Sequence, residues 1–359
     1  MARLLTFLLL PFAWIYAGVM AGRNWLYDRG WKRAETFAVP LLNVGNLRVG
    51  GTGKTPHVMW LVEELLRQGH RPAILSRGYG RRSRGPRLAG ATDSAATVGD
   101  EPWQYYGQFA TRQVPVAVAE KRGLGVALLL REHPEITVIV LDDAYQHRAV
   151  RPALNVLLSE WTRPFYTDYV LPAGRLREAR AGAARADVVI ITKCPPEAPA
   201  VARAAVERRV RRYARAGVPV LFSAYAYDTP QRLWAMDEAV GAVHALAPGP
   251  GPALLLTGIA QPGPLRAHLK EQGYDIRFHA EFPDHHAFTP ADLAGLRAHW
   301  QPGWPIFTTE KDATRLLDSA LGAVRAGLLI YTIPVWVAFL SDGGAVLRRL
   351  LPPVPARRP

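Results

Sequence analysis

The sequence is poor in cysteine and in lysine. Its 359 residues contain one cysteine, Cys194. A single thiol excludes an internal disulfide framework and a cysteine-rich zinc module, and it favours a reducing compartment. Only six of the 44 basic residues are lysines, and with 30 acidic residues the net charge is +14. This excess indicates either anionic partners or an arginine-favouring genome.

Charged residues are also scarce, at 21% of the chain, whereas apolar residues make up 49%. This balance excludes a disordered or fibrous protein. The length is sufficient for two domains, each with its own hydrophobic core. No internal repeat of fixed period is evident.

The N-terminus lacks charge over a long stretch, because 19 residues separate Arg3 from Arg23. As a helix this stretch is roughly 28 Å long, close to the ~30 Å of a bilayer core. Trp25 and Trp31 follow among basic residues, as at a membrane interface. A cleaved signal peptide or a buried core helix are the alternatives. We predict a membrane-associated helix over residues 1–30, with the rest of the chain on the cytoplasmic side.

Downstream, short apolar runs alternate with segments of helical periodicity. Continuous apolar runs are typical of strands buried on both faces of a parallel sheet, so we predict an α/β fold. The runs are Phe37–Val44, Pro72–Leu75, Val114–Ala119, Thr137–Leu141, Ala186–Thr192, Val218–Phe222 and Ala253–Thr257.

A glycine-rich stretch lies between the first of these runs and a helical segment. Glycines let successive backbone N–H groups turn towards phosphate oxygens, a lysine reaches the terminal phosphates, and a hydroxyl serves Mg²⁺. Gly50, Gly51, Gly53, Lys54 and Thr55 supply these groups in order. The usual pattern has glycine where this chain has Arg48. We predict a phosphate-binding P-loop, with a flexible glycine turn as the alternative.

Two adjacent carboxylates, Asp142 and Asp143, follow the apolar run Thr137–Leu141. The carboxyl end of a parallel strand is where a P-loop protein places the acid that organises Mg²⁺. A helix cap is the alternative interpretation. Given the glycine-rich stretch, we predict a metal-organising role.

Three further stretches are ambiguous from their residues alone. Asp100 precedes an aromatic helical segment and fits a helix cap as well as a catalytic role. The basic loop Arg77–Arg87 suits an anionic group or solvent. His285 and His286 follow Asp284. A zinc site is improbable there without further ligands, and a histidine beside an aspartate suits proton handling.

Together these motifs resemble one family, the tetraacyldisaccharide 4'-kinases, which phosphorylate a lipid A precursor in Gram-negative bacteria. The matches run in the family's order from about Leu42 to about Leu317. They are VGNLRVGGTGKTP, SRGYGR, GDEP, LDDAYQH, LPAGRLREA, ITK, TGIAQP, FPDHHAFT and TEKDA. The family's loop lacks the first glycine, as here. Ala144 and Tyr145 stand where the family usually has Gly-Phe.

The resemblance implies transfer of the γ-phosphoryl of ATP to the 4'-hydroxyl of a tetraacylated glucosamine disaccharide 1-phosphate. It implies a P-loop domain over 31–152, a second α/β domain over 153–327, and a return of 328–359 to the first domain. It also implies action at the inner membrane, with no nucleic acid and no obligate protein partner.

Residue roles follow from the same resemblance. The nucleotide-binding segment would comprise Arg48, Val49, Gly50, Gly51, Thr52, Gly53, Lys54 and Thr55. Thr55 and Asp142 would organise Mg²⁺, and Asp143 is a further candidate ligand. Asp100 would accept the proton of the sugar hydroxyl, and His285, rather than His286, would support it, with Lys54 acting on the phosphates.

Further contacts to substrate or phosphate are expected from Arg77, Arg177 and Glu178. Two other classes of protein remain as alternatives. A P-loop ATPase or GTPase that partitions to membranes would share the loop but would need no sugar site. A basic nucleic-acid-binding protein would account for the charge but not for the apolar N-terminus.

Overall fold

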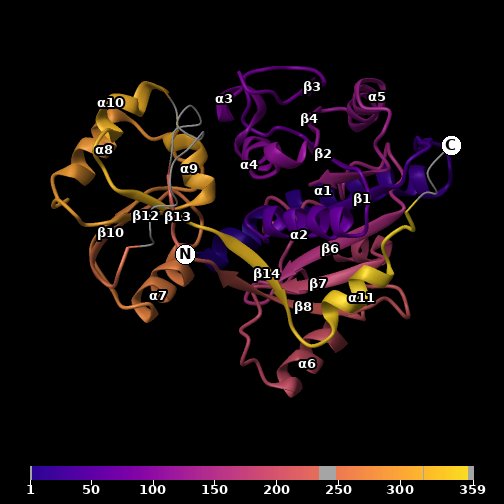
Figure 1. The fold of residues 1–359 in the computed structure, drawn as a ribbon. Coiled ribbons are helices and arrows are strands. Elements are labelled where there is room, and N and C mark those ends of the chain that lie inside the picture. Colours follow the sequence, from indigo (N-terminus) through magenta and orange to yellow (C-terminus); the bar gives the residue numbers. More distant parts are fainter. Residues whose placement is uncertain (1, 234–247, 318, 355–359) are drawn as a thin grey trace.

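The computed structural model describes residues 2–233, 248–317 and 319–354. These residues form two β-sheets with helices packed around them (Figure 1). The larger sheet has nine strands in the order β14-β8-β7-β6-β1-β5-β2-β4-β3. The smaller has five in the order β11-β10-β12-β13-β9. Neighbouring strands are parallel except at β3, β9 and β14. The predicted α/β class is therefore confirmed.

The nine-stranded sheet is built from both ends of the chain. Its strands are β1 (Leu41–Asn46), β2 (Pro72–Ser76), β3 (Arg87–Leu88), β4 (Val116–Val118), β5 (Val138–Asp142), β6 (Leu154–Glu160), β7 (Val188–Thr192), β8 (Val220–Tyr227) and β14 (Val335–Phe339). The helices beside it are α1 (Ala2–Asp28), α2 (Lys54–Arg67), α3 (Ala95–Val98), α4 (Asp100–Phe109), α5 (Arg122–Glu132), α6 (Ala200–Val210) and α11 (Gly343–Arg349).

Both faces of this sheet are covered, which is why its central strands read as continuous apolar runs. Leu42 and Val44 of β1 pack with α2, α4 and α11. Leu41, from the same strand but pointing the other way, packs with α5. Alternate residues of β1 thus enter two separate cores, and all six residues of the strand are buried.

The smaller unit packs helices around its own sheet. Its strands are β9 (Gln231–Arg232), β10 (Gly251–Thr257), β11 (Tyr274–Glu281), β12 (Ile306–Thr309) and β13 (Ile330–Ile333). Its helices are α7 (Gly263–Glu271), α8 (Pro290–Arg297), α9 (Glu310–Leu316) and α10 (Gly322–Arg325). Figure 1 shows α9 on the side that faces α4, and the helices are in contact.

The chain crosses between the two sheets twice, at neighbouring positions. It leaves β8 for β9 and returns from β13 to β14. Tyr227 of β8 lies opposite Val335 of β14, and the Asp228 N–H donates to the Pro334 carbonyl at 3.0 Å. The two crossing segments are therefore hydrogen-bonded to each other.

The division that we expected at residue 152 is wrong. Strands β6, β7 and β8 continue the nine-stranded sheet beyond that residue, because β6 pairs directly with β1. The smaller unit begins only at β9. Of the C-terminal segment 328–359, β13 remains in the small sheet and β14 joins the large one, and residues 355–359 lie outside the described part.

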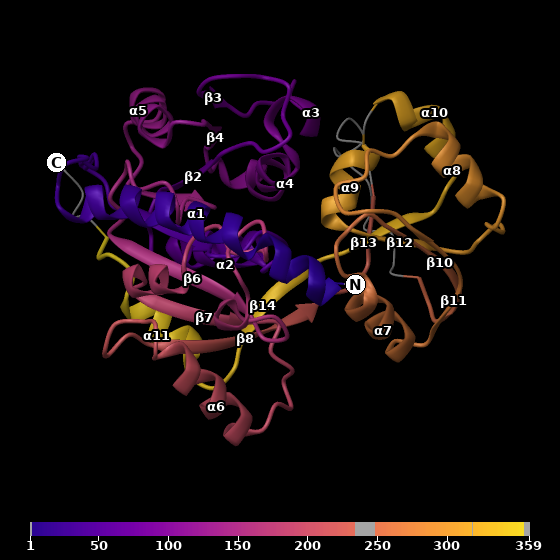
Figure 2. The same cartoon turned by 180° about the vertical axis from the view of Figure 1, so that it is seen from behind.

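Helix α1 lies along one side of the large sheet (Figure 2). Its second half is tied to the sheet's loops: Tyr16 donates to the Arg177 carbonyl at 3.0 Å and Arg23 to the Gln146 carbonyl at 2.9 Å. Several large apolar side chains of α1 nevertheless face outward; they are Phe7, Leu8, Phe12, Trp14, Ile15 and Val19. Within the described residues, no helix combines the length and apolarity needed to cross a membrane.

Candidate active site

The glycine-rich loop connects β1 to the N-terminus of α2. Gly50 and Gly53 have φ values of 117° and 85°, which glycine adopts without strain. No side chain caps the first turn of α2, so its N–H groups have no side-chain acceptor. A helix N-terminus of this kind is suited to an anion, because free N–H donors and the positive end of the helix dipole coincide.

Not every residue of this loop is available to a ligand. The Arg48 guanidinium donates from Nε to Asp168 Oδ2 at 2.7 Å, and the Val49 N–H donates to the Arg175 carbonyl at 2.8 Å. The Thr52 hydroxyl accepts from Asn46 Nδ2 at 2.6 Å. Arg48, Val49 and Thr52 thus use these groups to hold the loop's shape.

The two carboxylates at the end of β5 face this loop. Lys54 Nζ lies 3.7 Å from Asp143 Oδ2, and an Arg177 Nη2 donates to the same oxygen at 2.9 Å. Ser76 donates to Asp142 Oδ2 at 3.0 Å. The predicted Lys54, Asp142, Asp143 and Arg177 therefore come together at one edge of the sheet.

The carboxylates differ in their affinity for protons. Burial, and then the charge of Asp143, raises the pKa of Asp142 to about 6. Desolvation would also raise the pKa of Asp143, but Lys54 and Arg177 hold it below its ordinary value. Because the two carboxylates share one buried site, the negative charge of Asp142 is the one that a bound cation would stabilise most.

Mg²⁺ fits this edge of the sheet by its donor chemistry. Asp142 Oδ1 and Asp143 Oδ1 are buried and have no hydrogen-bond partner. Carboxylate oxygens are the ligands that Mg²⁺ takes, usually one or two of them together with water and substrate phosphates. The described residues contain no group of three or more His, Cys, Asp or Glu side chains arranged for a metal. A Mg²⁺ site that is completed by substrate phosphates and water does not need three protein ligands.

Asp100 and His285 meet from opposite units of the molecule. Asp100 is the first residue of α4, beside the large sheet, and His285 follows β11 of the small one. His285 Nδ1 lies 3.1 Å from Asp100 Oδ2, although 185 residues separate them in sequence. His285 has a φ of 62°, a left-handed conformation seldom adopted by non-glycine residues. This backbone strain indicates that the surrounding fold imposes the position of the ring.

Two basic residues of α9 surround this pair. Lys311 Nζ lies 3.0 Å from His285 Nε2 and 3.1 Å from Asp284 Oδ1. Arg315 Nε lies 3.5 Å from Asp100 Oδ2. Burial would raise the pKa of Asp100, but the His285 hydrogen bond and the charges of Arg315 and Lys311 hold it below its ordinary value.

The two groups of side chains belong to one site. Glu101, next to Asp100, is close enough to help raise the pKa of Asp142, and its Oε1 lies 3.9 Å from Lys311 Nζ. His286, by contrast, turns away, because its Nε2 lies 2.9 Å from Asp292 and its ring stacks on Phe282. Only the first histidine of the pair is directed at Asp100.

The remaining candidates lie around these groups. Glu178 accepts from Asn24 of α1 at 3.0 Å and from Arg185 at 2.7 Å, so it anchors α1 to the sheet. Arg77 is exposed at the end of β2.

Sequence reasoning assigned no role to Lys311, Arg315 or Lys193. Lys193 Nζ donates to the Gly51 carbonyl at 2.7 Å and to Gln261 of the small unit at 3.0 Å. Lys311 and Lys193 were visible in the TEKDA and ITK motifs, but their partners lie far away along the chain. A lone lysine in a motif gives no local signal of the group that it will contact.

This combination defines a class. A parallel α/β sheet that presents a glycine-rich loop, a helix N-terminus and paired aspartates beside an aspartate–histidine pair is typical of a phosphotransferase.

Comparisons with known proteins specify the family. The family model described as tetraacyldisaccharide-1-P 4'-kinase matches residues 5–352. The chain is 38% identical to the tetraacyldisaccharide 4'-kinase of Cytophaga hutchinsonii, covering 94% of this chain and 93% of that protein. It is 39% identical to that of Bacteroides thetaiotaomicron, covering 93% and 89%. The chain therefore belongs to the tetraacyldisaccharide 4'-kinase family and is a kinase.

A solved structure is similar over almost the whole chain. The crystal structure of LpxK from Aquifex aeolicus in complex with ATP superposes with a TM-score of 0.72 and 27% sequence identity. The match covers 96% of this chain and 98% of that one. Both units of the fold are thus shared with LpxK.

Proposed function

We propose that this chain transfers the γ-phosphoryl of ATP to the 4'-hydroxyl of a tetraacylated glucosamine disaccharide 1-phosphate, forming the bisphosphorylated lipid A precursor. The observation that carries the proposal is the contact between Asp100 and His285 beside the glycine-rich loop and Lys54. An ATPase that needs no acceptor has no use for such a pair.

The glycine-rich loop acts in this proposal as a P-loop. The N–H groups of Gly50, Gly51 and Gly53–Thr55 and the Lys54 ammonium bind the β- and γ-phosphates and neutralise the charge of the moving phosphoryl group. Thr55, Asp142 and Asp143 hold Mg²⁺, which supplies further neutralisation of the phosphate oxygens when bound. The buried oxygens without partners on both aspartates support this assignment.

Asp100 is the group that accepts the proton. Lys311 Nζ carries only donors, so His285 Nε2 must accept from it, and the ring's proton then sits on Nδ1 and is donated to Asp100 Oδ2. With both ring nitrogens engaged, His285 orients Asp100 instead of contacting the acceptor. Asp100 Oδ1 is left to take the hydroxyl proton as the O–P bond forms and the bond to the ADP oxygen breaks.

Incubation with ATP, Mg²⁺ and the lipid disaccharide tests the proposal. We expect a second phosphate on the lipid by mass spectrometry and ADP release that depends on the acceptor. ADP release at the same rate without lipid would instead favour a P-loop ATPase. Lys54→Ala should abolish both signals.

We further propose that α1 holds the enzyme at the cytoplasmic face of the inner membrane, lying in the interface. Phe7, Phe12, Trp14 and Ile15 each expose more than half of their side chains, and burying an apolar side chain yields about 1.5–3 kcal/mol. Trp14→Ser with Ile15→Ser should weaken binding to anionic lipid vesicles at least tenfold. Catalysis on detergent-dispersed acceptor should stay unchanged, whereas unchanged vesicle binding would contradict this role for α1.

A further inference from the structure

The glycine-rich loop between β1 and α2 is held by hydrogen bonds to its carbonyl groups. Three consecutive carbonyls accept from side chains: Gly51 from Lys193 Nζ at 2.7 Å, Thr52 from Thr192 Oγ1 at 2.9 Å, and Gly53 from His57 Nδ1 at 2.7 Å. Thr192 ends β7, Lys193 follows it, and His57 lies in the first turn of α2. The proposed chemistry assigns none of these three donors a role.

Each of these hydrogen bonds also sets the direction of an N–H group. In a trans peptide, the carbonyl of one residue and the N–H of the next point in opposite directions. Because His57 holds the Gly53 carbonyl, the Lys54 N–H points away from the His57 ring. Thr192 does the same for the Gly53 N–H by holding the Thr52 carbonyl. No side chain caps this end of α2, so these N–H groups are directed to the open side of the loop.

The partners of the His57 ring fix where its proton lies. The Gly53 carbonyl can only accept, so Nδ1 carries the proton, and Nε2 accepts from Ser223 Oγ of β8 at 2.9 Å. Burial lowers the pKa of His57 to about 4, so the ring is neutral at neutral pH. Phe339 of β14 packs edge-on against it. The ring is therefore held in one tautomer, with its only N–H directed at the loop.

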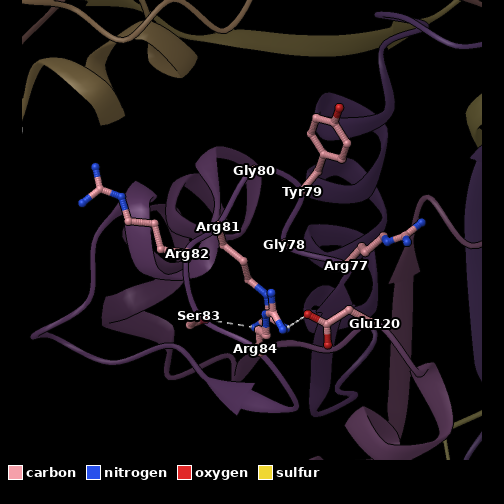
Figure 3. Close-up of a pocket in the computed structure, with 9 residues that line it drawn as sticks. All are labelled: Arg77, Gly78, Tyr79, Gly80, Arg81, Arg82, Ser83, Arg84 and Glu120. Atoms are coloured by element: carbon pink, nitrogen blue, oxygen red, sulfur yellow. Dashed lines mark hydrogen bonds and ion pairs between the residues drawn. The ribbon is translucent and has the colours of Figure 1, made fainter.

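The glycine-rich loop that follows β2 is supported in a different way. Its Arg81 side chain donates to Ser83 at 3.3 Å (Figure 3) and to the Gly85 carbonyl at 2.7 Å, so residues of that loop support one another. The loop after β1 depends instead on donors from β7, from the residue after β7 and from α2. A change on these elements can therefore alter the loop without removing a group that contacts ATP.

We propose that His57 is a positioning residue for the nucleotide: it holds the peptide between Gly53 and Lys54 so that the N–H of this peptide faces a phosphate of ATP, and Ser223 keeps the His57 ring in the required tautomer. This inference rests on the proposed role of the loop as a P-loop. Glycine loses more conformational freedom on ordering than any other residue, so a glycine-rich loop gains affinity when its bound shape is already fixed.

Titration with ATP tests the proposal without any acceptor. His57→Leu with Ser223→Ala removes the donor to the loop and replaces both members of the buried hydrogen bond by apolar groups, which is nearly neutral for folding. We expect the Kd for ATP and for ADP to rise roughly tenfold, as for one misdirected hydrogen bond to a charged group. Ser223→Ala alone keeps the donor, and its Kd should rise less than about threefold.

His57→Asn is the conservative variant, because its Nδ2 amide takes the position of the ring's Nδ1 and can donate to the Gly53 carbonyl. It should recover most of the affinity for ATP. The KM for the acceptor should be unchanged in all of these variants. An unchanged Kd in the double variant, or no recovery in His57→Asn, would overturn the proposal.

His70→Leu is the matched control. His70 follows the other end of α2, is buried like His57, and uses both ring nitrogens, with Thr137 Oγ1 and the Pro352 carbonyl as partners. Its loss should lower the Tm but leave the Kd for ATP at the wild-type value. A rise in Kd equal to that of the His57 variant would show a general effect of destabilisation and overturn the proposal.

The tautomer provides a readout that does not depend on affinity. ¹⁵N NMR of the imidazole should place the His57 proton on Nδ1 with no titration between pH 6 and pH 8, and a proton on Nε2 would contradict the proposal. Failure of the proposed function is distinct, since wild type would then bind ATP but transfer no phosphate to the lipid.

Discussion

The two halves of the candidate site are built in different ways. The nucleotide half, with Lys54 and Asp143, lies on strands and loops of one sheet, and its central motif is a continuous stretch from β1 to α2. The acceptor half exists only where two units meet: Asp100 comes from one, and His285 with Lys311 from the other. A phosphate cradle can therefore persist without the small unit, whereas proton acceptance depends on how the units are held together.

The largest expected effect is on Asp100. Asp100→Asn keeps the shape of the side chain but removes the proton acceptor, so we expect kcat to fall roughly 10²–10⁴-fold with the Kd for ATP unchanged. Steady-state kinetics and nucleotide titration separate these quantities. A variant near wild-type activity would return Asp100 to the role of a helix N-terminal residue.

The pair should also behave as one unit. His285→Gln removes the group that orients Asp100, and the double variant with Asp100→Asn should lose far less than the product of the two single losses. His286→Gln is the matched control, because His286 contacts Asp292 instead, and its effect should be smaller. If the losses in kcat were fully multiplicative in this double-mutant cycle, Asp100 and His285 would act independently, and the proposed pair would be wrong.

The nucleotide half carries a cost in stability that the acceptor half does not. Because the pKa of Asp142 rises to about 6 in the folded protein, folding binds a proton that the unfolded chain has lost, and stability falls as pH rises from about 4 to about 6. Above that range, without Mg²⁺, Asp142→Asn should raise the free energy of unfolding by about 3 kcal/mol. Urea unfolding at pH 8 and pH 4 measures it, and the gain should vanish at pH 4.

Asp143→Asn provides the opposite comparison. The pKa of Asp143 is held low by Lys54 and Arg177, so its charge stabilises the fold above its unfolded pKa. This variant should be less stable than wild type at pH 8, and the deficit should shrink as the pH falls. If both variants changed the free energy of unfolding at pH 8 in the same direction, the opposite pKa shifts of the two aspartates would be contradicted.

The smallest expected effect is on Lys311. Lys311→Met removes the donor that fixes the His285 ring and one of the charges that keep the pKa of Asp100 low. We expect kcat to fall about tenfold and the acidic limb of its pH profile to move to higher pH, because Asp100 is then protonated more readily. Lys311→Arg should restore part of both. An unmoved acidic limb would show that Lys311 serves only packing.

The sequence predicted best what is local or periodic. The run that became β1, the glycines after it and the carboxylates after β5 are all signalled by neighbours in the chain. Strand β6 was not predicted, because Asn155, Ser159 and Glu160 interrupt its apolar pattern. Each is satisfied from elsewhere: Asn155 by Asn43 at 2.5 Å, Ser159 by the Phe165 N–H at 3.1 Å and Glu160 by Lys193 at 3.3 Å.

Contacts between distant segments could not be predicted from the sequence, because no neighbouring residues signal them. The family resemblance assigned catalytic roles to Asp100 and His285. The residues around them, taken alone, were equally consistent with ordinary structural roles. The domain boundary was misplaced because β6 was not predicted and because β7 and β8 read like any other buried strands, and nothing local says which sheet a strand joins. The segment 328–337 reads as one strand, yet Pro334 divides it between two sheets.

The paired crossing segments make the small unit an insertion in the topological sense. Since Tyr227 already lies opposite Val335, β8 and β14 are the two arms of a hairpin whose tip has been replaced by a domain. A short turn could close that hairpin without moving either strand. The nine-stranded sheet is thus a complete architecture in its own right, and a chain of this shape could have acquired its acceptor chemistry through the lengthening of a single loop.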